Sequence, residues 1–252
     1  MTGSIAGPPP ANLIEAPGTS EAAWSGWLPT LRTCPVLSTG TWASAVIVAA
    51  HPDDEVLGAG GLISLLASAG TRLRLIAVTD GEASHPRYGD PAALADRRAQ
   101  ERSEALLALG AADAEELRLG LPDSGLTGQE HDIASSLRNL VTGFDVCLAP
   151  WEDDVHADHE AVGRAARQAG RPTFFYPVWM WHWARPADKR VPWQQAFRVP
   201  LPPAVATRKR AAISCFGSQL EPRAGGGGPV LSAAFVSHFT RDCELVFPMM
   251  RQ

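Results

Sequence analysis

Short apolar runs alternate with amphipathic segments from residue 45 onward. The apolar runs are of strand length and occupy 45–50, 72–78, 115–120, 144–150 and 172–178. Between them, segments with helical spacing of apolar residues occupy 56–70, 92–110, 129–142 and 159–170. Buried strands that alternate with helices are typical of a parallel sheet whose two faces are both covered. The pattern therefore predicts an α/β fold with a mostly parallel sheet and helices on both faces.

The two ends of the chain depart from this alternation. Residues 1–40 contain six prolines and three charged residues, so we expect an irregular N-terminal arm that is mobile over about its first 20 residues. Three apolar residues should pin part of the arm to the body: Trp24, Trp27 and Leu28. Residues 41–252 are expected to form a single domain, in which 184–252 are the least regular part.

Within this last part the pattern predicts few elements. We expect a helix over about 205–216, with Lys209 and Arg210 on its solvated face. The run of glycines at 225–228 predicts a flexible loop. The apolar and β-branched residues within 230–247 indicate a strand or a pair of strands.

The composition argues against several classes of partner. The net charge is −5 and no basic run stands out, so nucleic acids and anionic membranes are unfavourable partners. The longest apolar stretches are of strand length, so no membrane span is expected, and the N-terminus lacks the pattern of a signal peptide. The cysteines form no CxxC pair, which indicates reduced thiols and a cytoplasmic protein: Cys34, Cys147, Cys215 and Cys243.

The segment AHPDDE at 50–55 places four polar side chains directly after the first apolar run. One aspartate could simply cap the helix that follows. A strand, glycines and Asp80 also resemble a dinucleotide site, but the glycines fall inside the helix, and two carboxylates at the turn would repel a pyrophosphate. A metal site is the third interpretation, because His51 and Asp54 can reach one point.

A second cluster of the same kind lies at 151–159, with the sequence WEDDVHADH. It follows the apolar run 144–150, and His156 and His159 have the same spacing at the start of a helix. Since functional sites of such folds lie at the carboxyl ends of the strands, we expect the two clusters to meet. A catalytic zinc ion needs three protein ligands and an open position, which the two clusters together could provide.

These motifs resemble those of the LmbE-like, or PIG-L, family of zinc-dependent N-deacetylases. The resemblance extends from about residue 45 to 220, and it rests on AHPDDE at 50–55, TDGE at 79–82, RxxE at 98–101, LPDSGL at 121–126, HADH at 156–159 and KRAAISCFGSQ at 209–219. It implies a Rossmann-like fold and an activity that removes acetyl groups from N-acetylglucosamine conjugates.

The resemblance also implies a role for individual residues. Zn²⁺ would be bound by His51, Asp54 and His159, and Fe²⁺ could occupy the same ligands. Asp53 would be the general base. His156 would steady the tetrahedral intermediate and, if protonated, add a positive charge. Arg98 and Asp123 match positions that contact the sugar in the family, whereas Ala157 stands where the family usually has proline.

Two features of the sequence allow more than one interpretation. Asp158 could hold His156 through its second ring nitrogen, or it could cap the helix. In a strand, three tryptophans at alternate positions would share one face: Trp179, Trp181 and Trp183. They could form an aromatic wall against a sugar or aglycone, or belong to the core or to a subunit interface.

We therefore expect zinc-dependent hydrolysis of an N-acyl amide, foremost an N-acetyl amide, on an amino-sugar conjugate. Water activated by the metal would attack, with an aspartate as base. The alternatives are an amidase that cuts a larger acyl group and a non-catalytic carbohydrate-binding member of the fold. The expected partner is a small glycoconjugate, and a homo-oligomer is compatible with the sequence.

Overall fold

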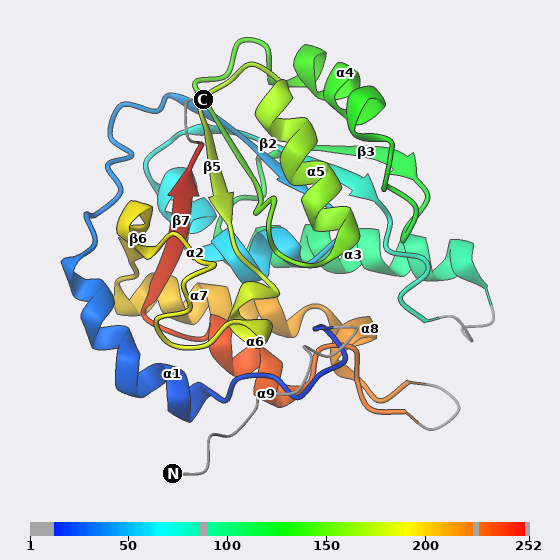
Figure 1. The fold of residues 1–252 in the computed structure, drawn as a ribbon. Helices are drawn as coiled ribbons and strands as arrows, with labels where there is room; N and C mark the ends of the chain where they lie inside the picture. Colours follow the sequence, from blue (N-terminus) through cyan, green and yellow to red (C-terminus); the bar gives the residue numbers. More distant parts are fainter. Residues whose placement is uncertain (1–12, 86–89, 224–226, 250–252) are drawn as a thin grey trace.

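The computed structural model describes residues 13–85, 90–223 and 227–249. At its centre lies a seven-stranded sheet with the order β3-β2-β1-β4-β5-β7-β6 (Figure 1). The strands are β1 (Ser44–Ala49), β2 (Arg72–Thr79), β3 (Glu115–Leu121), β4 (Val146–Pro150), β5 (Thr173–Tyr176), β6 (Phe197–Pro200) and β7 (Cys243–Pro248). Strands β1 to β5 are parallel, and β7 runs antiparallel to both of its neighbours. The predicted α/β, Rossmann-like fold with a mostly parallel sheet is confirmed.

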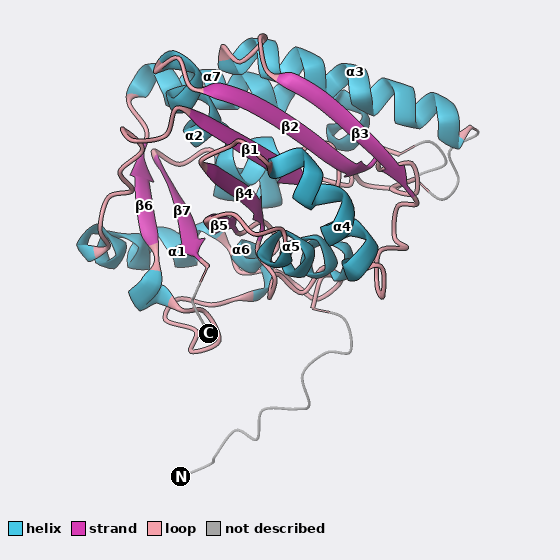
Figure 2. Cartoon of the chain, turned by 90° about the horizontal axis from the view of Figure 1, so that it is seen from above, coloured by secondary structure: helices cyan, strands magenta, loops and turns pink. Residues whose placement is uncertain are grey.

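Helices cover both faces of the sheet, as Figure 2 shows from above. On one face α2 and α3 both pack against α7, and on the other α4 packs against α5. These helices are α2 (Asp54–Ser68), α3 (Pro91–Leu109), α4 (Glu130–Val141), α5 (Ala157–Gln168) and α7 (Pro203–Ser214). All five predicted helices are thus present. Within the described part of the chain, none of the helices has both the length and the apolar character needed to cross a bilayer.

Helix α2 is buried along almost its whole length, which is unusual for a helix that covers a sheet. Two glycines permit this burial. A Cβ atom at Gly58 would overlap the ring of Tyr176, and one at Gly61 would overlap the side chain of Leu201. Close packing of this kind is possible only without a side chain. It fixes the N-terminus of α2, which carries the AHPDDE motif, against the carboxyl end of the sheet.

A buried ion pair crosses the middle of α2. Nζ of Lys209 donates to Oε1 of Glu244 at 2.7 Å and to the carbonyl oxygen of Leu57 at 2.7 Å. The carboxylate of Glu244 accepts from the backbone N–H groups of Gly61 and Leu62 at 2.6 and 2.8 Å. Lys209 is only 3% exposed, so its predicted place on a solvated helix face is wrong. The pair joins α2, α7 and β7.

The prediction of an irregular N-terminal arm is wrong over 21–33. These residues form α1 (Glu21–Trp27) and a 3₁₀ helix (Leu28–Thr33). Pro29 lies in the first turn of the latter, where a missing N–H group costs nothing. Trp24 is fully buried, and its indole N–H donates to the carbonyl oxygen of Trp181 at 2.8 Å. We expected mobility over about the first 20 residues, of which 1–12 lie outside the described residues.

Two predictions for the C-terminal half also need correction. The strand expected to carry the three tryptophans is wrong, because β5 ends at Tyr176 and residues 180–183 form the short helix α6 (Met180–Trp183). Within 230–247, β7 is a strand, but residues 233–239 form α9 (Ala233–Val236) and a 3₁₀ turn, since Ser232 caps a helix there. The glycine run at 225–228 lies partly outside the described residues.

Candidate metal centre

The two His/Asp clusters meet at the carboxyl edge of the sheet. Strands β1 and β4 are neighbours, so the loop that follows β1 and the loop that follows β4 lie side by side. Each loop leads into a helix whose N-terminus faces the same point, α2 after β1 and α5 after β4. This is the position at which the strand order reverses, where sites of doubly wound folds are usually found.

The loops around this point have strained backbones. Among the described residues, four non-glycine residues have positive φ angles: Asp53, Ser124, Val155 and Ala187. The first three belong to the loops that form the site. Asp53 has φ of 133° and still begins α2, because its carbonyl oxygen accepts from the N–H groups of Val56 and Leu57. Such strain costs about 1–3 kcal/mol for each residue and persists where the surroundings hold it.

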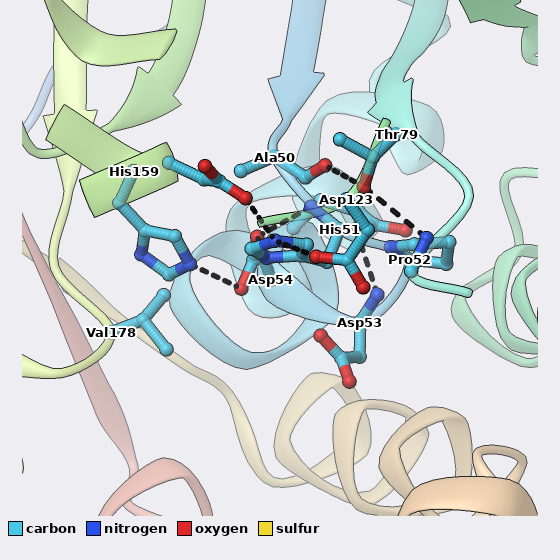
Figure 3. Close-up of polar contacts among 12 residues, drawn as sticks. Ala50, His51, Pro52, Asp53, Asp54, Thr79, Asp123, His159 and Val178 are labelled. Carbon is cyan, nitrogen blue, oxygen red and sulfur yellow. Dashed lines mark hydrogen bonds and ion pairs between the residues drawn. The ribbon is translucent and has the colours of Figure 1, made fainter. Parts of the chain in front are cut away.

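The three predicted zinc ligands converge. Oδ1 of Asp54 lies 3.1 Å from Nε2 of His159, and Oδ2 of Asp54 lies 3.4 Å from Nδ1 of His51. Figure 3 shows the imidazole of His159 pointing at the Asp54 carboxylate. Ligand atoms about 2.0–2.1 Å from a tetrahedral ion are separated by about 3.3–3.4 Å. Each of the two contacts is therefore close to the spacing of neighbouring ligands on one ion, and they reach different oxygen atoms of Asp54.

The donor atoms also suit a metal ion. Nδ1 of His156 is buried and has no hydrogen-bond partner among the described residues, and the nearest acceptor to the buried Nε2 of His159 is the Asp54 carboxylate. One ring nitrogen from each of His51, His156 and His159 lies within 4.8 Å of the others. Imidazole nitrogens together with a carboxylate oxygen are ligands that Zn²⁺ and Fe²⁺ accept. The residues present therefore fit a divalent ion of this type.

Carboxylates dominate the charge of the centre. Burial opposes the charged form of His51, but contacts with Asp123, Asp158 and Asp54 outweigh it and raise the pKa well above its usual value. Burial also opposes the charged form of His159, yet the charge of Asp54 and the bond to Asp154 raise its pKa to about 9. The surrounding carboxylates thus favour positive charge at this point, and a metal ion would replace protons on these imidazoles.

Asp53 leaves the same turn in another direction and meets Arg98. Oδ2 of Asp53 accepts from Nη2 of Arg98 at 3.0 Å, and the same guanidinium donates to the carbonyl oxygens of Pro52 and Gly81 at 2.6 and 2.8 Å. Burial raises the pKa of Asp53 to about 7; Arg98 opposes this shift and the charge of Asp54 adds to it. Arg98 is 2% exposed and holds the proposed base, while its predicted contact with a sugar stays a prediction.

His156 is the N-cap residue of α5 and lies beside the two other histidines. Its ring centroid lies 4.9 Å from that of His51 and 4.6 Å from that of His159. Burial, together with the positive charges of His159 and His51, lowers the pKa of His156 to about 3. The lowered pKa favours the uncharged ring, which suits a hydrogen bond, and the positive charge considered from the sequence stays a prediction.

Asp158 does not hold His156. Its Oδ2 lies 3.1 Å from Nε2 of His51 and accepts from the N–H group of Ser124, while its Oδ1 accepts from that of Leu126. Residues two apart in a helix do not face each other, which explains why the predicted pairing with His156 is wrong. The predicted capping role is wrong as well, because His156 occupies the N-cap. Asp158 orients His51 instead.

Asp123 joins the same histidine from another loop. Its Oδ1 lies 3.2 Å from Nε2 of His51, and its Oδ2 accepts from the N–H group of Ala83 at 2.9 Å. Burial raises the pKa of Asp123, but the bond to His51 and the other contacts outweigh it and lower the value to about 2. Asp123 also lines the cavity of the site, so it stays available for the predicted contact with a substrate.

Sequence reasoning missed Asp154. This fully buried carboxylate lies 2.8 Å from Nδ1 of His159 through its Oδ2. It also accepts from the backbone N–H groups of Val178, Trp179 and Met180, which starts α6. Metal-bound histidines usually donate their second ring N–H to a carboxylate. The acidic residues at 152–154, just before HADH, could therefore have indicated such a partner. Choosing Asp154 over Asp153 requires the conformation of the loop.

A cavity of about 140 Å³ opens onto these residues. The five predicted metal and catalytic residues line it: His51, Asp53, Asp54, His156 and His159. Further polar residues in the lining are Ser84, Arg98, Asp123, Ser124 and Gln219. Apolar residues complete it: Leu57, Val178, Trp179, Val230, Leu231 and Phe235. The other two tryptophans of the predicted wall, Trp181 and Trp183, are buried in the core.

Comparison with known proteins adds to this geometry. Residues 46–170 match the family model described as PIG-L, GlcNAc-PI de-N-acetylase. The chain is 36% identical over 156 residues to 1D-myo-inositol 2-acetamido-2-deoxy-alpha-D-glucopyranoside deacetylase 2 of Saccharopolyspora erythraea, a match that covers 50% of this chain and 56% of the relative. The match thus spans little more than half the length of that relative.

Two solved structures illustrate the likeness in fold. The conserved protein TT1542 from Thermus thermophilus is 30% identical, with a TM-score of 0.53 over 70% of this chain and 79% of that one. GalB, the 4-carboxy-2-hydroxymuconate hydratase from Pseudomonas putida, is 19% identical, with a TM-score of 0.62 over 83% and 97% of the two chains. The second likeness concerns the fold alone.

The family match, the fold and the residues of AHPDDE and HADH agree. The match covers both loops that build the centre, the one after β1 and the one after β4. The chain therefore belongs to the PIG-L family.

Proposed function

We propose that this protein hydrolyses the N-acetyl amide of an amino-sugar conjugate with the help of a bound zinc ion. The observation that carries the proposal is the position of Asp54 between His51 and His159, with Asp53 beside it in the same strained turn. Three of these residues are the proposed metal ligands. The fourth, Asp53, supplies a carboxylate that is not a proposed ligand. The name of the deacetylase from Saccharopolyspora erythraea supports this class of substrate.

Amide hydrolysis needs a nucleophile at neutral pH and a place for negative charge. Bound Zn²⁺ would acidify a water molecule and polarise the amide carbonyl group, and Fe²⁺ could take its place at the same ligands. Asp53 accepts the proton of the attacking water; its pKa of about 7 suits a base that works near neutral pH. Arg98 keeps the Asp53 carboxylate in one orientation through the contact between Nη2 and Oδ2.

His156 acts on the tetrahedral intermediate and on the leaving amine. It lies in the cavity as an uncharged ring, so it steadies the tetrahedral intermediate through a hydrogen bond and faces the leaving amine. The polar side of the cavity, with Ser84, Asp123 and Gln219, provides donors and acceptors for sugar hydroxyl groups. An amide with a larger acyl group would present the same bond to these residues and is the alternative substrate.

The remaining expectations concern the location of the protein in the cell and its partner. Four free cysteines support a reducing, cytoplasmic location. The acidic net charge of −5 supports a small glycoconjugate as the partner in preference to nucleic acid.

Release of acetate from a panel of N-acetylglucosamine conjugates tests the activity, and metal analysis of the same preparation tests the cofactor. We expect about one zinc or iron per chain and turnover of at least one conjugate. The variant His159→Ala should lose stoichiometric metal, and a full complement of metal in this variant would refute the ligand assignment. Binding of conjugates without release of acetate would favour a non-catalytic carbohydrate-binding protein.

A further inference from the structure

Part of the lining of the catalytic cavity is apolar, and most of this part comes from outside the segment that matches the family model. We call the side chains of Trp179, Val230, Leu231 and Phe235 the apolar wall. All four lie beyond residue 170, where the family match ends. The loop before α6 provides the tryptophan, the segment that leads into α9 provides Val230 and Leu231, and α9 itself provides Phe235. The wall is therefore a property of this chain that the matched segment does not explain.

The apolar wall is held rigidly. The N–H group of Trp179 donates to Oδ2 of Asp154 at 2.9 Å, and that of Leu231 donates to the carbonyl oxygen of Gln219 at 2.9 Å. Oγ of Ser232 caps the helix that carries Phe235. The rings of Trp179 and Phe235 pack with centroids 4.7 Å apart. A surface fixed in this way binds a ligand without a large loss of conformational entropy.

The three tryptophans at 179, 181 and 183 have separate environments. Trp181 and Trp183 are 6% and 9% exposed, and Trp181 packs edge-on against Trp24. Trp179 is only partly buried and lines the cavity. Ligand sites commonly combine an apolar surface with a few polar groups, which is the division seen here.

The position of the wall shows which part of a substrate it would meet. The rings of Trp179 and His156 are 6.2 Å apart and inclined by only 23°, so the wall begins directly beside His156. His156 faces the leaving amine in the proposed function, on which this argument rests. The amine remains attached to the sugar, whereas the acyl group leaves on the other side of the bond. The wall therefore lies on the side of the sugar and its aglycone.

We propose that the natural substrate is an amino sugar with an apolar aglycone, which the wall of Trp179, Val230, Leu231 and Phe235 binds. The polar residues of the lining bind the hydroxyl groups of the sugar. Contact of an aromatic ring with such a surface is worth about a tenfold or greater gain in affinity. A polar aglycone gains nothing from the wall and leaves it in contact with water.

Two matched substrate series test the proposal. In the first, the aglycone of N-acetylglucosamine is methyl or p-nitrophenyl; in the second, the methyl glycoside carries an acetyl or a butanoyl group. We expect kcat/KM to rise about tenfold or more with the aryl aglycone and not to rise with the longer acyl group. Equal values for the two glycosides, or a gain only with butanoyl, would overturn the proposal.

Variants connect the preference to the wall. Trp179→Leu and Phe235→Ala should each reduce the ratio of kcat/KM between aryl and methyl glycosides several-fold, to near one in the double variant. The control variant Trp42→Phe alters an aromatic residue that packs on Phe174, away from the cavity, and should keep the ratio. An unchanged ratio in well-folded wall variants contradicts the proposal.

A binding measurement separates this inference from the proposed function. Calorimetry with the two deacetylated products, methyl and p-nitrophenyl glucosaminide, needs no turnover. We expect the aryl amine to bind about tenfold or more tightly, and less so in Trp179→Leu. If this preference appears while no amide is hydrolysed, the wall assignment holds and the proposed function fails. If amides are hydrolysed and both products bind equally, the proposed function holds and the wall assignment fails.

Discussion

Oδ2 of Asp154 lies 2.8 Å from Nδ1 of His159, and the same carboxylate begins α6 by accepting three backbone N–H groups. One buried side chain therefore supports a proposed metal ligand and the backbone that presents Trp179 to the cavity. Burial raises the pKa of Asp154, and the contact with His159 opposes that shift. The stability of the loop and the metal affinity should consequently depend on the same residue.

Replacing Asp154 tests this double role. Asp154→Asn should weaken metal binding about 10–100-fold, because the histidine loses its charged acceptor. It should also lower the free energy of unfolding by about 1–3 kcal/mol, since buried N–H groups lose part of their partner. Competition with a chelator and denaturant unfolding measure the two effects. The control Asp153→Asn alters an exposed neighbour and should change neither; unaltered metal affinity in Asp154→Asn would exclude the support of His159.

The protonation of Asp53 should determine how kcat falls at acidic pH. A base must be deprotonated, and the pKa of Asp53 is raised to about 7. Below that value kcat should fall about tenfold per pH unit, and above it kcat should level off. Asp53→Asn should keep its metal and lose kcat by about 100-fold or more. Stopped assays across pH together with metal analysis check both results, and full activity in the variant would remove Asp53 from the mechanism.

Arg98 offers a way to distinguish support of the base from contact with a sugar. Its positive charge favours the ionised form of Asp53, so Arg98→Met should raise the pKa of Asp53 and move the acid limb of kcat to higher pH. Activity should therefore recover in part as the pH is raised. The neighbouring variant Arg97→Met should keep the wild-type limb. A rise in KM with an unshifted limb would instead support the predicted sugar contact.

The buried ion pair of Lys209 and Glu244 should contribute strongly to stability. Lys209→Met leaves the buried carboxylate without its counter-charge and should lower the free energy of unfolding by about 3–5 kcal/mol. The double variant Lys209→Met/Glu244→Gln should recover part of this loss. Urea denaturation measures both, with exposed Arg210→Met as the control, expected within about 0.5 kcal/mol of wild type. A loss as small as that of the control would show that the pair contributes little.

Local sequence patterns were sufficient to predict an element where its apolar residues follow one clear run or period. The buried strands and the five long helices follow from apolar runs and helical spacing, since each pattern matches one kind of element. The N-terminal segment and the tryptophan segment were misread for a common reason. Trp24 is anchored by the backbone of Trp181, and α6 is started by Asp154, so distant partners decide both conformations.

By itself, the sequence determined the fold class, the carboxyl-edge location of the site and the types of side chain that meet there. These follow from periodicity and from the ends of parallel strands, which are local properties of the chain. The tertiary structure alone decided which carboxylate serves which histidine: Asp154 orients His159, Asp158 orients His51, and Arg98 holds Asp53. Hydrogen bonds depend on distance and direction to within about an ångström, and no spacing along the chain records these when the partners come from separate loops.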